Sequence, residues 1–180
     1  MNDIIRNIQN RRSTRVYSSA PLPQETLRAV AEAGLYAPTA MGQQPWHLSV
    51  VRSAKMMAKL KALLTSIMRG CGELKPDEEL NLFYGAPAAV LVSGDPAAIA
   101  PAVDCALADL CMMLAAESFG IGSCWVSYVV HLNDNAEGRA LLDELNVPAG
   151  YKVMSSVSLG HIAEATPRAP RREGTVSYSV

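Results

Sequence analysis

AIAPAVDCALADLCMMLAAESF, residues 98–119, predicts a helix that is apolar on nearly every side rather than along one stripe. Three acidic residues interrupt it, Asp104, Asp109 and Glu117. At 100° per residue they lie about 140° and then about 80° apart, so they form no shared acidic face. We therefore expect this helix to be buried on most sides, against its own sheet and against a second subunit.

Strands and amphipathic helices are predicted on both sides of this segment. Residues 87–95, PAAVLVSGD, form the continuous apolar run of a strand that is covered on both faces. Strands are also predicted within residues 121–130 and 151–161, with a capped helix at 133–147 between them. The alternation of strands and helices favours an α+β fold with a mixed central sheet flanked by helices.

The N-terminal half follows the same pattern. Ile4, Ile5 and Ile8 recur at helical spacing and lead to the basic sequence RRSTR at residues 11–15. A second helix is predicted from Pro23 to Tyr36, a strand at 47–51, and a helix capped by Ser53. Two further segments are distinctive: residues 70–86 are loop-like and could form a lid, and Val176, Tyr178 and Val180 alternate as in a last strand.

Length, composition and charge limit the class of protein. The 180 residues fit one domain, 1–180, and 49% of them are hydrophobic against 18% charged. This apolar excess favours a homodimer, because one small monomer rarely hides so much apolar surface. A net charge of −1 gives no electrostatic reason to expect a nucleic acid or a membrane as partner. With no signal-peptide pattern at the start, we expect a cytoplasmic protein.

Side chains that could perform catalysis by themselves form no motif. His47, His131 and His161 stand in three unrelated contexts. The four cysteines lack the CxxC spacing of a metal site, so we expect no metal and reduced thiols, mostly in the core: Cys71, Cys105, Cys111 and Cys124. The sequence therefore names no catalytic residue.

Arginines and one loop suggest an anionic, flat ligand. Arg11, Arg12 and Arg15 surround Ser13, and three further arginines lie between residues 168 and 172. Several charge-assisted donors with a hydroxyl neighbour suit a phosphate, although exposed arginines are often merely solvated. Residues 37–47, APTAMGQQPWH, combine small residues that let backbone approach a flat ligand with Gln43 and Gln44, whose amides could bond to its polar edge.

With these residues the chain resembles the nitroreductase family of FMN-dependent oxidoreductases. Members begin with Arg-(Arg/His)-Ser-x-(Arg/Lys) and continue through a helix to a Pro-Ser-(Ser/Ala)-x-Asn-x-Gln-Pro-Trp loop, as residues 11–51 do here. The similarity continues through GAPAAVLV at 85–92, ADLCMMLAAESFGIGSCW at 108–125 and residues 145–172, so it covers nearly the whole chain. Gly42 departs from the family's asparagine, and Tyr128 stands among residues that replace glycines common after the tryptophan.

The resemblance implies an intertwined homodimer with FMN bound between the subunits. Arg11, Arg12 and Ser13 would hold the phosphate and ribityl chain, and Arg15 would approach the N1 and O2 side of the flavin. Arg171 and Arg172 would complete the phosphate site, and the backbone at Ser127 would lie against flavin N5. The loop residues that would reach the partner's flavin are Pro38, Thr39, Ala40 and Gly42.

The implied activity is hydride transfer from NADH or NADPH through flavin N5 to a small electron-poor acceptor such as a nitroaromatic or a quinone. No protein acid or base is obligatory for this step, because the flavin carries the chemistry. Two alternatives remain open. One is a different reaction on the same fold, such as reductive dehalogenation, substrate dehydrogenation or flavin fragmentation. The other is a flavin-binding dimer without turnover.

Overall fold

The computed structural model describes residues 2–179, and its centre is a sheet in the strand order β1-β2-β4-β3. The strands are β1 (Trp46–Val51), β2 (Ala88–Gly94), β3 (Gly122–Val126) and β4 (Lys152–Gly160). All three strand pairs are antiparallel, and a register shift interrupts the β2–β4 pair between Val92 and Ser93. The parallel pairing that a mixed sheet requires is confined to the bridge between Ser13 and Ser123. The predicted α+β fold is confirmed.

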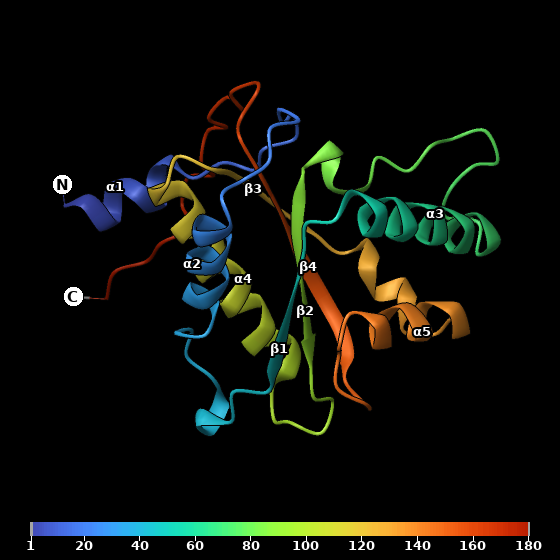
Figure 1. Cartoon of the computed structure of the whole chain (residues 1–180). Coiled ribbons are helices and arrows are strands. Elements are labelled where there is room, and N and C mark those ends of the chain that lie inside the picture. The colour runs from blue at the N-terminus through green and yellow to red at the C-terminus, as the bar shows by residue number, and fades with distance from the viewer. Residues whose placement is uncertain (1, 180) are drawn as a thin grey trace.

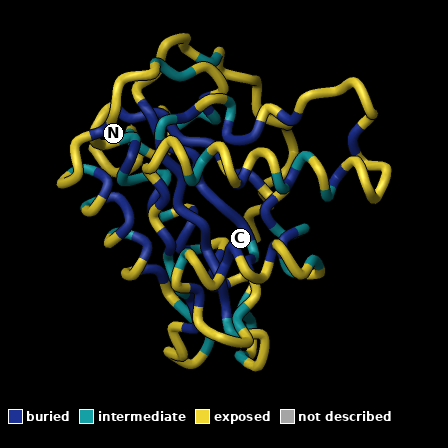
Figure 2. The backbone as a smooth tube through the Cα atoms, turned by 45° about the vertical axis from the view of Figure 1, so that its right-hand side comes forward, coloured by how far each residue is buried: buried dark blue, intermediate teal, exposed yellow. Residues whose placement is uncertain are grey.

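Helices cover both faces of the sheet, which gives three layers (Figure 1). Helices α2 (Gln24–Gly34) and α4 (Pro101–Ser118) lie on one face, and α3 (Ala54–Gly70) and α5 (Ala136–Glu144) lie on the other. Helix α1 (Asp3–Asn10) packs beside α4. Short 3₁₀ turns complete the chain: η1 (Ala40–Gly42), η2 (Leu82–Gly85) and η3 (Tyr128–Leu132). Figure 2 shows the buried backbone running through the middle of the molecule between exposed outer turns.

Each face of the sheet carries its own hydrophobic core. Val90 and Val92 of β2 point toward α2 and α4, whereas Leu91 of the same strand points toward α3. Every residue of β2 is buried, as the apolar run predicts for a strand covered on both faces. The Ser53 side chain accepts a hydrogen bond from the Met56 backbone N–H, which confirms the predicted cap of α3.

Helix α4 has the buried character that its sequence predicts. Met112 and Ala116 have no exposed surface and pack between α2 and the sheet, and Asp104 and Asp109 are also buried. The helix begins at Pro101, three residues after the predicted start, because proline lacks the backbone N–H that an earlier start would require. Val103 and Leu110 remain exposed on the face that neither the sheet nor α2 covers.

Two other expectations need correction or restriction. Residues 71–81 are largely irregular as predicted, but buried Leu74 and Leu80 fix them to the α3 core, so they are not a free lid. Residues 175–179 form no strand within this chain; Val176 and Tyr178 are exposed, and Val180 lies outside the described residues. Among residues 2–179, no helix combines the length and apolar character that a transmembrane span requires.

Candidate functional site

The basic segment that follows α1 lies against the first residues of β3. Ser13 forms a bridge with Ser123, and the Thr14 backbone N–H donates to the Ser123 carbonyl at 2.9 Å. Thr14 is buried, and a Cβ atom at Gly122 would lie 2.7 Å from its hydroxyl oxygen. This close approach requires glycine at residue 122 and fixes the backbone that carries Arg11, Arg12, Ser13 and Arg15.

The C-terminal segment 161–172 runs beside the same backbone. The Thr166 hydroxyl donates to the Ser13 carbonyl at 3.1 Å, and the Arg168 guanidinium donates to the Gln9 carbonyl at 2.8 Å. The two segments meet at the top of Figure 1, although more than 140 residues separate them in the chain. The structure thus brings together the two arginine clusters that the sequence showed apart.

Four guanidinium groups in this region repel one another. Partial desolvation, followed by the positive charges of Arg168, Arg171 and Arg11, lowers the pKa of Arg12. The Arg12 side chain donates to the carbonyls of Gln9 and Arg11, and the carboxylate of Glu117 only partly offsets the repulsion. Within residues 2–179, no ion pair joins these arginines to a carboxylate. Such a concentration of positive charge suits an anionic ligand.

Arg168 is a site residue that the sequence singled out only as part of a cluster. It acts on Arg12 as strongly as any other charge there, whereas Arg172 is not among the groups that perturb Arg12. Pro167, which precedes Arg168, and Pro170, which lies between Arg168 and Arg171, favour extended backbone. Arg168 and Arg171 are three residues apart on this extended backbone. That short separation could have indicated that both side chains reach the same cluster.

Arg15 lies beside the arginine cluster and is held by Tyr84. Its guanidinium carbon is 5.6 Å from the centre of the Tyr84 ring, and the hydrogen bond to Tyr84 raises the pKa of Arg15. Phe83 and Tyr84 have φ values of 56° and 55°, a left-handed conformation that is strained for bulky residues. Arg15 therefore stays charged, and the strained turn η2 positions its partner Tyr84.

The buried thiol of Cys124 lies beneath these groups. Burial raises its pKa, although Arg15, Ser13 and Arg11 act in the opposite direction. The thiol is therefore a neutral part of the floor of the site. This confirms the expectation of a core cysteine, although the sequence gave no reason to place it beside the arginines.

The predicted ligand loop, residues 38–44, lies at the other end of α4. The buried carboxylate of Asp104 accepts a hydrogen bond from the Ala40 backbone N–H at 3.0 Å. Asp104 is in the first turn of α4, and Glu117, near Arg12, is in the last. Thirteen residues of helix separate the two by about 20 Å, and Figure 1 shows η1 at the bottom and the arginine segments at the top.

The predicted site residues therefore fall into two groups within one chain. Arg11, Arg12, Ser13 and Arg15 meet Arg171, but the loop residues do not join them: Pro38, Thr39, Ala40 and Gly42. The loop itself is well defined, because the Gln44 backbone N–H donates to the Thr39 hydroxyl at 3.2 Å and Met41 has φ 52°. Gln43, expected to face a ligand, instead accepts a bond from the Ile99 N–H at 2.9 Å.

Ser127 follows β3 directly and is the N-cap residue of η3. Its carbonyl accepts a hydrogen bond from the Val130 N–H at 3.1 Å, and its side chain is exposed. Tyr128 and Trp125, on either side of it, each expose more than a third of their surface. Ser127 therefore stands between two exposed aromatic residues, on whose rings a flat ligand could stack.

Trp125 is oriented by a buried carboxylate. Its indole N–H donates to Asp109 Oδ2 at 2.9 Å, and the Ser155 hydroxyl donates to the same oxygen at 2.5 Å. The other oxygen of Asp109 has no partner among the described residues. Burial raises the pKa of Asp109 to about 6, and the two hydrogen bonds only partly oppose this shift.

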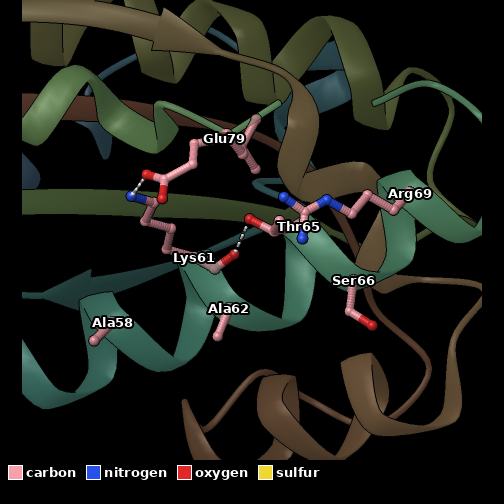
Figure 3. A pocket seen from close by; sticks show the side chains of 8 residues that line it. Ala58, Lys61, Ala62, Thr65, Ser66, Arg69 and Glu79 are labelled. Atoms are coloured by element: carbon pink, nitrogen blue, oxygen red, sulfur yellow. Dashed lines mark hydrogen bonds and ion pairs between the residues drawn. The ribbon is translucent and has the colours of Figure 1, made fainter. Parts of the chain in front are cut away.

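An open groove of about 540 Å³ lies elsewhere, along α3 (Figure 3). Lys61, Arg69 and Glu79 line it together with small residues of α3, and Lys61 pairs with Glu79 at 3.4 Å. None of the predicted site residues contributes to this groove. This groove and the arginine cluster therefore lie on different parts of the surface.

Comparisons with known proteins bear on the family and the fold. The model of the family described as "Nitroreductase family" matches residues 8–161. A provisionally named NADH dehydrogenase/NAD(P)H nitroreductase of Archaeoglobus fulgidus is 32% identical over 166 residues, covering 89% of this chain and 86% of that protein.

Two solved structures are similar over almost their whole length. The nitroreductase of Bacteroides fragilis with bound FMN has 32% identity and a TM-score of 0.93, covering 99% of this chain and 100% of that one. The nitroreductase of Desulfitobacterium hafniense with bound FMN has 28% identity and a TM-score of 0.89, covering 99% of each chain.

Replacing Asp109 with Asn should change how stability depends on pH. The folded protein holds the Asp109 proton more tightly than the unfolded chain, whose carboxyl has its ordinary pKa of 3.8. This contribution to stability is complete below about pH 4 and is lost as the pH rises through about 6. Relative to Asp109→Asn, the wild type should lose on the order of 3 kcal/mol over this range. Urea unfolding at several pH values and one protein concentration measures it; a pH-independent difference would contradict it.

Proposed function

The chain belongs to the nitroreductase family, and on this premise we propose that it is an FMN-dependent oxidoreductase that uses NAD(P)H to reduce an electron-poor acceptor. The observation that carries the proposal is the convergence of four arginines, without an ion-paired carboxylate, beside the first residues of β3. Nitroaromatics and quinones are the acceptor classes that we propose. When bound, FMN would supply the hydride chemistry.

The arginine cluster fits the phosphate of FMN. A phosphate monoester carries between about 1.5 and 2 negative charges and offers three acceptor oxygens. Arg11, Arg12 and Arg171 would supply charge-assisted donors, with Arg168 as an additional cation, and Ser13 would supply a hydroxyl. Mutual repulsion of the arginines would be relieved by the ligand, so part of the binding energy comes from removing an unfavourable arrangement.

Arg15 would stabilise the negative charge that the flavin ring gains on reduction. Its bond to Tyr84 keeps the guanidinium charged and limits its rotamers. A fixed cation acts without reorganisation when charge develops, which is the efficient form of electrostatic stabilisation. No side chain is assigned as acid or base, so the protein would act in this mechanism by position: Arg15 would stabilise charge, and the Ser127 backbone and Tyr128 would lie against the face of the ring.

We propose that the second half of the site comes from another copy of the chain. Pro38, Thr39, Ala40 and Gly42 lie too far from Arg15 to contact the same flavin, but a homodimer could bring the loop of one copy to the arginines of the other. Exposed apolar residues on α1, α4 and the C-terminal tail support such an interface, among them Ile4, Leu110 and Tyr178. Each dimer would then hold two FMN molecules.

The activity is tested by anaerobic titration of the flavin-loaded protein with NADH and, separately, with NADPH. Loss of flavin absorbance, followed by its recovery on adding a nitroaromatic or a quinone, is the expected result. Failure of both nicotinamides to bleach the flavin would identify a flavin-binding dimer without turnover. Bleaching with little recovery by either acceptor, at full FMN occupancy, would indicate a different reaction on the same fold.

Substitution of the phosphate arginines should weaken FMN binding. Arg11→Ala and Arg171→Ala each remove a charge-assisted donor, which should cost about 2 kcal/mol, or about thirtyfold in Kd. Arg28→Ala is the matched control, because Arg28 lies on α2 and pairs with Glu32 at 3.1 Å. Flavin fluorescence titration of the apoproteins gives the Kd values. Wild-type affinity in both variants would show that these arginines are solvated surface residues.

Removal of residues 174–180 should loosen the dimer and release FMN together. Within one chain Val176 and Tyr178 are exposed, and the Thr175 hydroxyl donates to the Arg172 carbonyl at 3.2 Å. We propose that the tail adds a strand to the partner and thereby connects the two flavin sites. Sedimentation and flavin fluorescence measure both effects; an unchanged dimer with its flavin would mean that the tail is a free terminus.

A further inference from the structure

Cys71, Glu73 and His131 gather at a place that the proposed oxidoreductase site does not use. One possible ligand atom from each residue, a thiol sulfur, a carboxylate oxygen and an imidazole nitrogen, lies within 4.8 Å of the other two. Cys71 and Glu73 come from the turn after α3, and His131 comes from η3, 58 residues further along the chain. No metal-binding motif is visible in the sequence, because these three residues become neighbours only in the fold.

The turn that carries Cys71 and Glu73 is rigid. The Cys71 N–H donates to the Ile67 carbonyl, and the Glu73 N–H donates to the Met68 carbonyl at 2.9 Å. Gly72 between them has φ 80°, which glycine adopts without strain. Buried Leu74 anchors the turn on its other side. The thiol and the carboxylate therefore project from a backbone that is already fixed.

His131 is fixed equally well. Its neighbours Val129 and Leu132 are fully buried, and the Asn133 side chain bonds to both the N–H and the carbonyl of Val153. The imidazole Nε2 lies 3.1 Å from Glu73 Oε2, and only a quarter of the side chain is exposed. Two of the three groups already face each other, so a cation could enter without a backbone movement.

We propose that Cys71, Glu73 and His131 bind one zinc ion. Zinc takes thiolate, imidazole and carboxylate ligands, and a tetrahedron with bonds of 2.0–2.3 Å places ligand atoms about 3.3–3.8 Å apart. Small rotations of exposed side chains bring the three atoms to that spacing. A thiolate and an imidazole disfavour calcium and magnesium, and the fourth position is left for water.

The charges of the ligands themselves also favour a cation. Residues 71–81 contain four acidic residues and one lysine, although Lys61 pairs with Glu79 and Arg69 lies two residues before Cys71. Thiolate and carboxylate ligands together would neutralise the two charges of the ion. A bound ion would join the end of α3 to η3, which begins one residue after Ser127. A bound zinc ion would therefore restrain η3, whether or not a flavin binds next to Ser127.

Zinc calorimetry of the whole flavin-loaded protein tests the site. The protein is stripped with a chelator, kept reduced without added thiols, and titrated with ZnCl₂. One zinc per chain is expected. Cys71→Ser and His131→Gln should each weaken binding by more than the roughly 10–100-fold that loss of an outer-shell partner costs. Cys111→Ser and His47→Gln are matched controls outside the cluster and should bind zinc like the wild type.

Cobalt provides a second measurement that reports the ligands directly. Co²⁺ in a tetrahedral thiolate site gives visible d–d bands and a charge-transfer band, which are read as difference spectra against the flavin. These bands should appear in the wild type and in both controls and be absent in Cys71→Ser. No zinc binding by the wild type, or binding by Cys71→Ser at wild-type affinity, would overturn the proposal and leave only the Glu73–His131 ion pair.

Discussion

Burial of helix α4 is the constraint on which the rest of the structure depends. A helix that is apolar on nearly all sides must be covered by α2 and the sheet, and two of its three carboxylates, those of Asp104 and Asp109, are then buried with it. A buried carboxylate is costly unless it is hydrogen-bonded or protonated. Asp104 meets this requirement with one oxygen, which accepts from the Ala40 N–H, and Asp109 does so with one oxygen, which accepts from Trp125 and Ser155. The second oxygen of each has no partner among the described residues. Hydrogen bonds to the buried carboxylates of α4 thus position two surface features, the loop at Ala40 and the ring of Trp125.

The arginine cluster represents the opposite situation, since its positive charge is only partly offset by Glu117. The backbone bonds between segments 11–17 and 161–168 force the guanidinium groups together, so the fold stabilises a local arrangement that repels itself. Such an arrangement is retained when a ligand of opposite charge completes it. This physical argument supports an anion site without reference to any relative, and similarity to FMN-bound nitroreductases gives the anion an identity to test.

Local signals in the sequence predicted most helices and strands. The order of the strands and the contacts between distant residues could not be predicted, because they depend on long-range pairing. Ser53 and the apolar run of β2 each indicated an element through capping or periodicity, whereas the predicted start of α4 overlooked the effect of Pro101. The antiparallel order of the sheet depends on which strands meet, and no single segment carries that information. The same holds for Arg168 beside Arg12 and for Cys71 beside His131, each pair brought together by the fold. Gln43 was misread because its amide satisfies the backbone of residue 99 instead of a ligand.

The length of α4 also bears on how two sites in a homodimer would communicate. Each copy offers the loop held by Asp104 at one end of the helix and the arginines near Glu117 at the other, about 20 Å away. In the proposed dimer, each flavin would therefore contact opposite ends of two different α4 helices, and each helix would contact both flavins. A packed helix transmits displacement along its axis better than a loop does, because its interior is close-packed. In that dimer, a movement of the Ala40 loop at one flavin would act on the α4 helix that carries the loop. The other end of the same helix would lie at the phosphate of the second flavin.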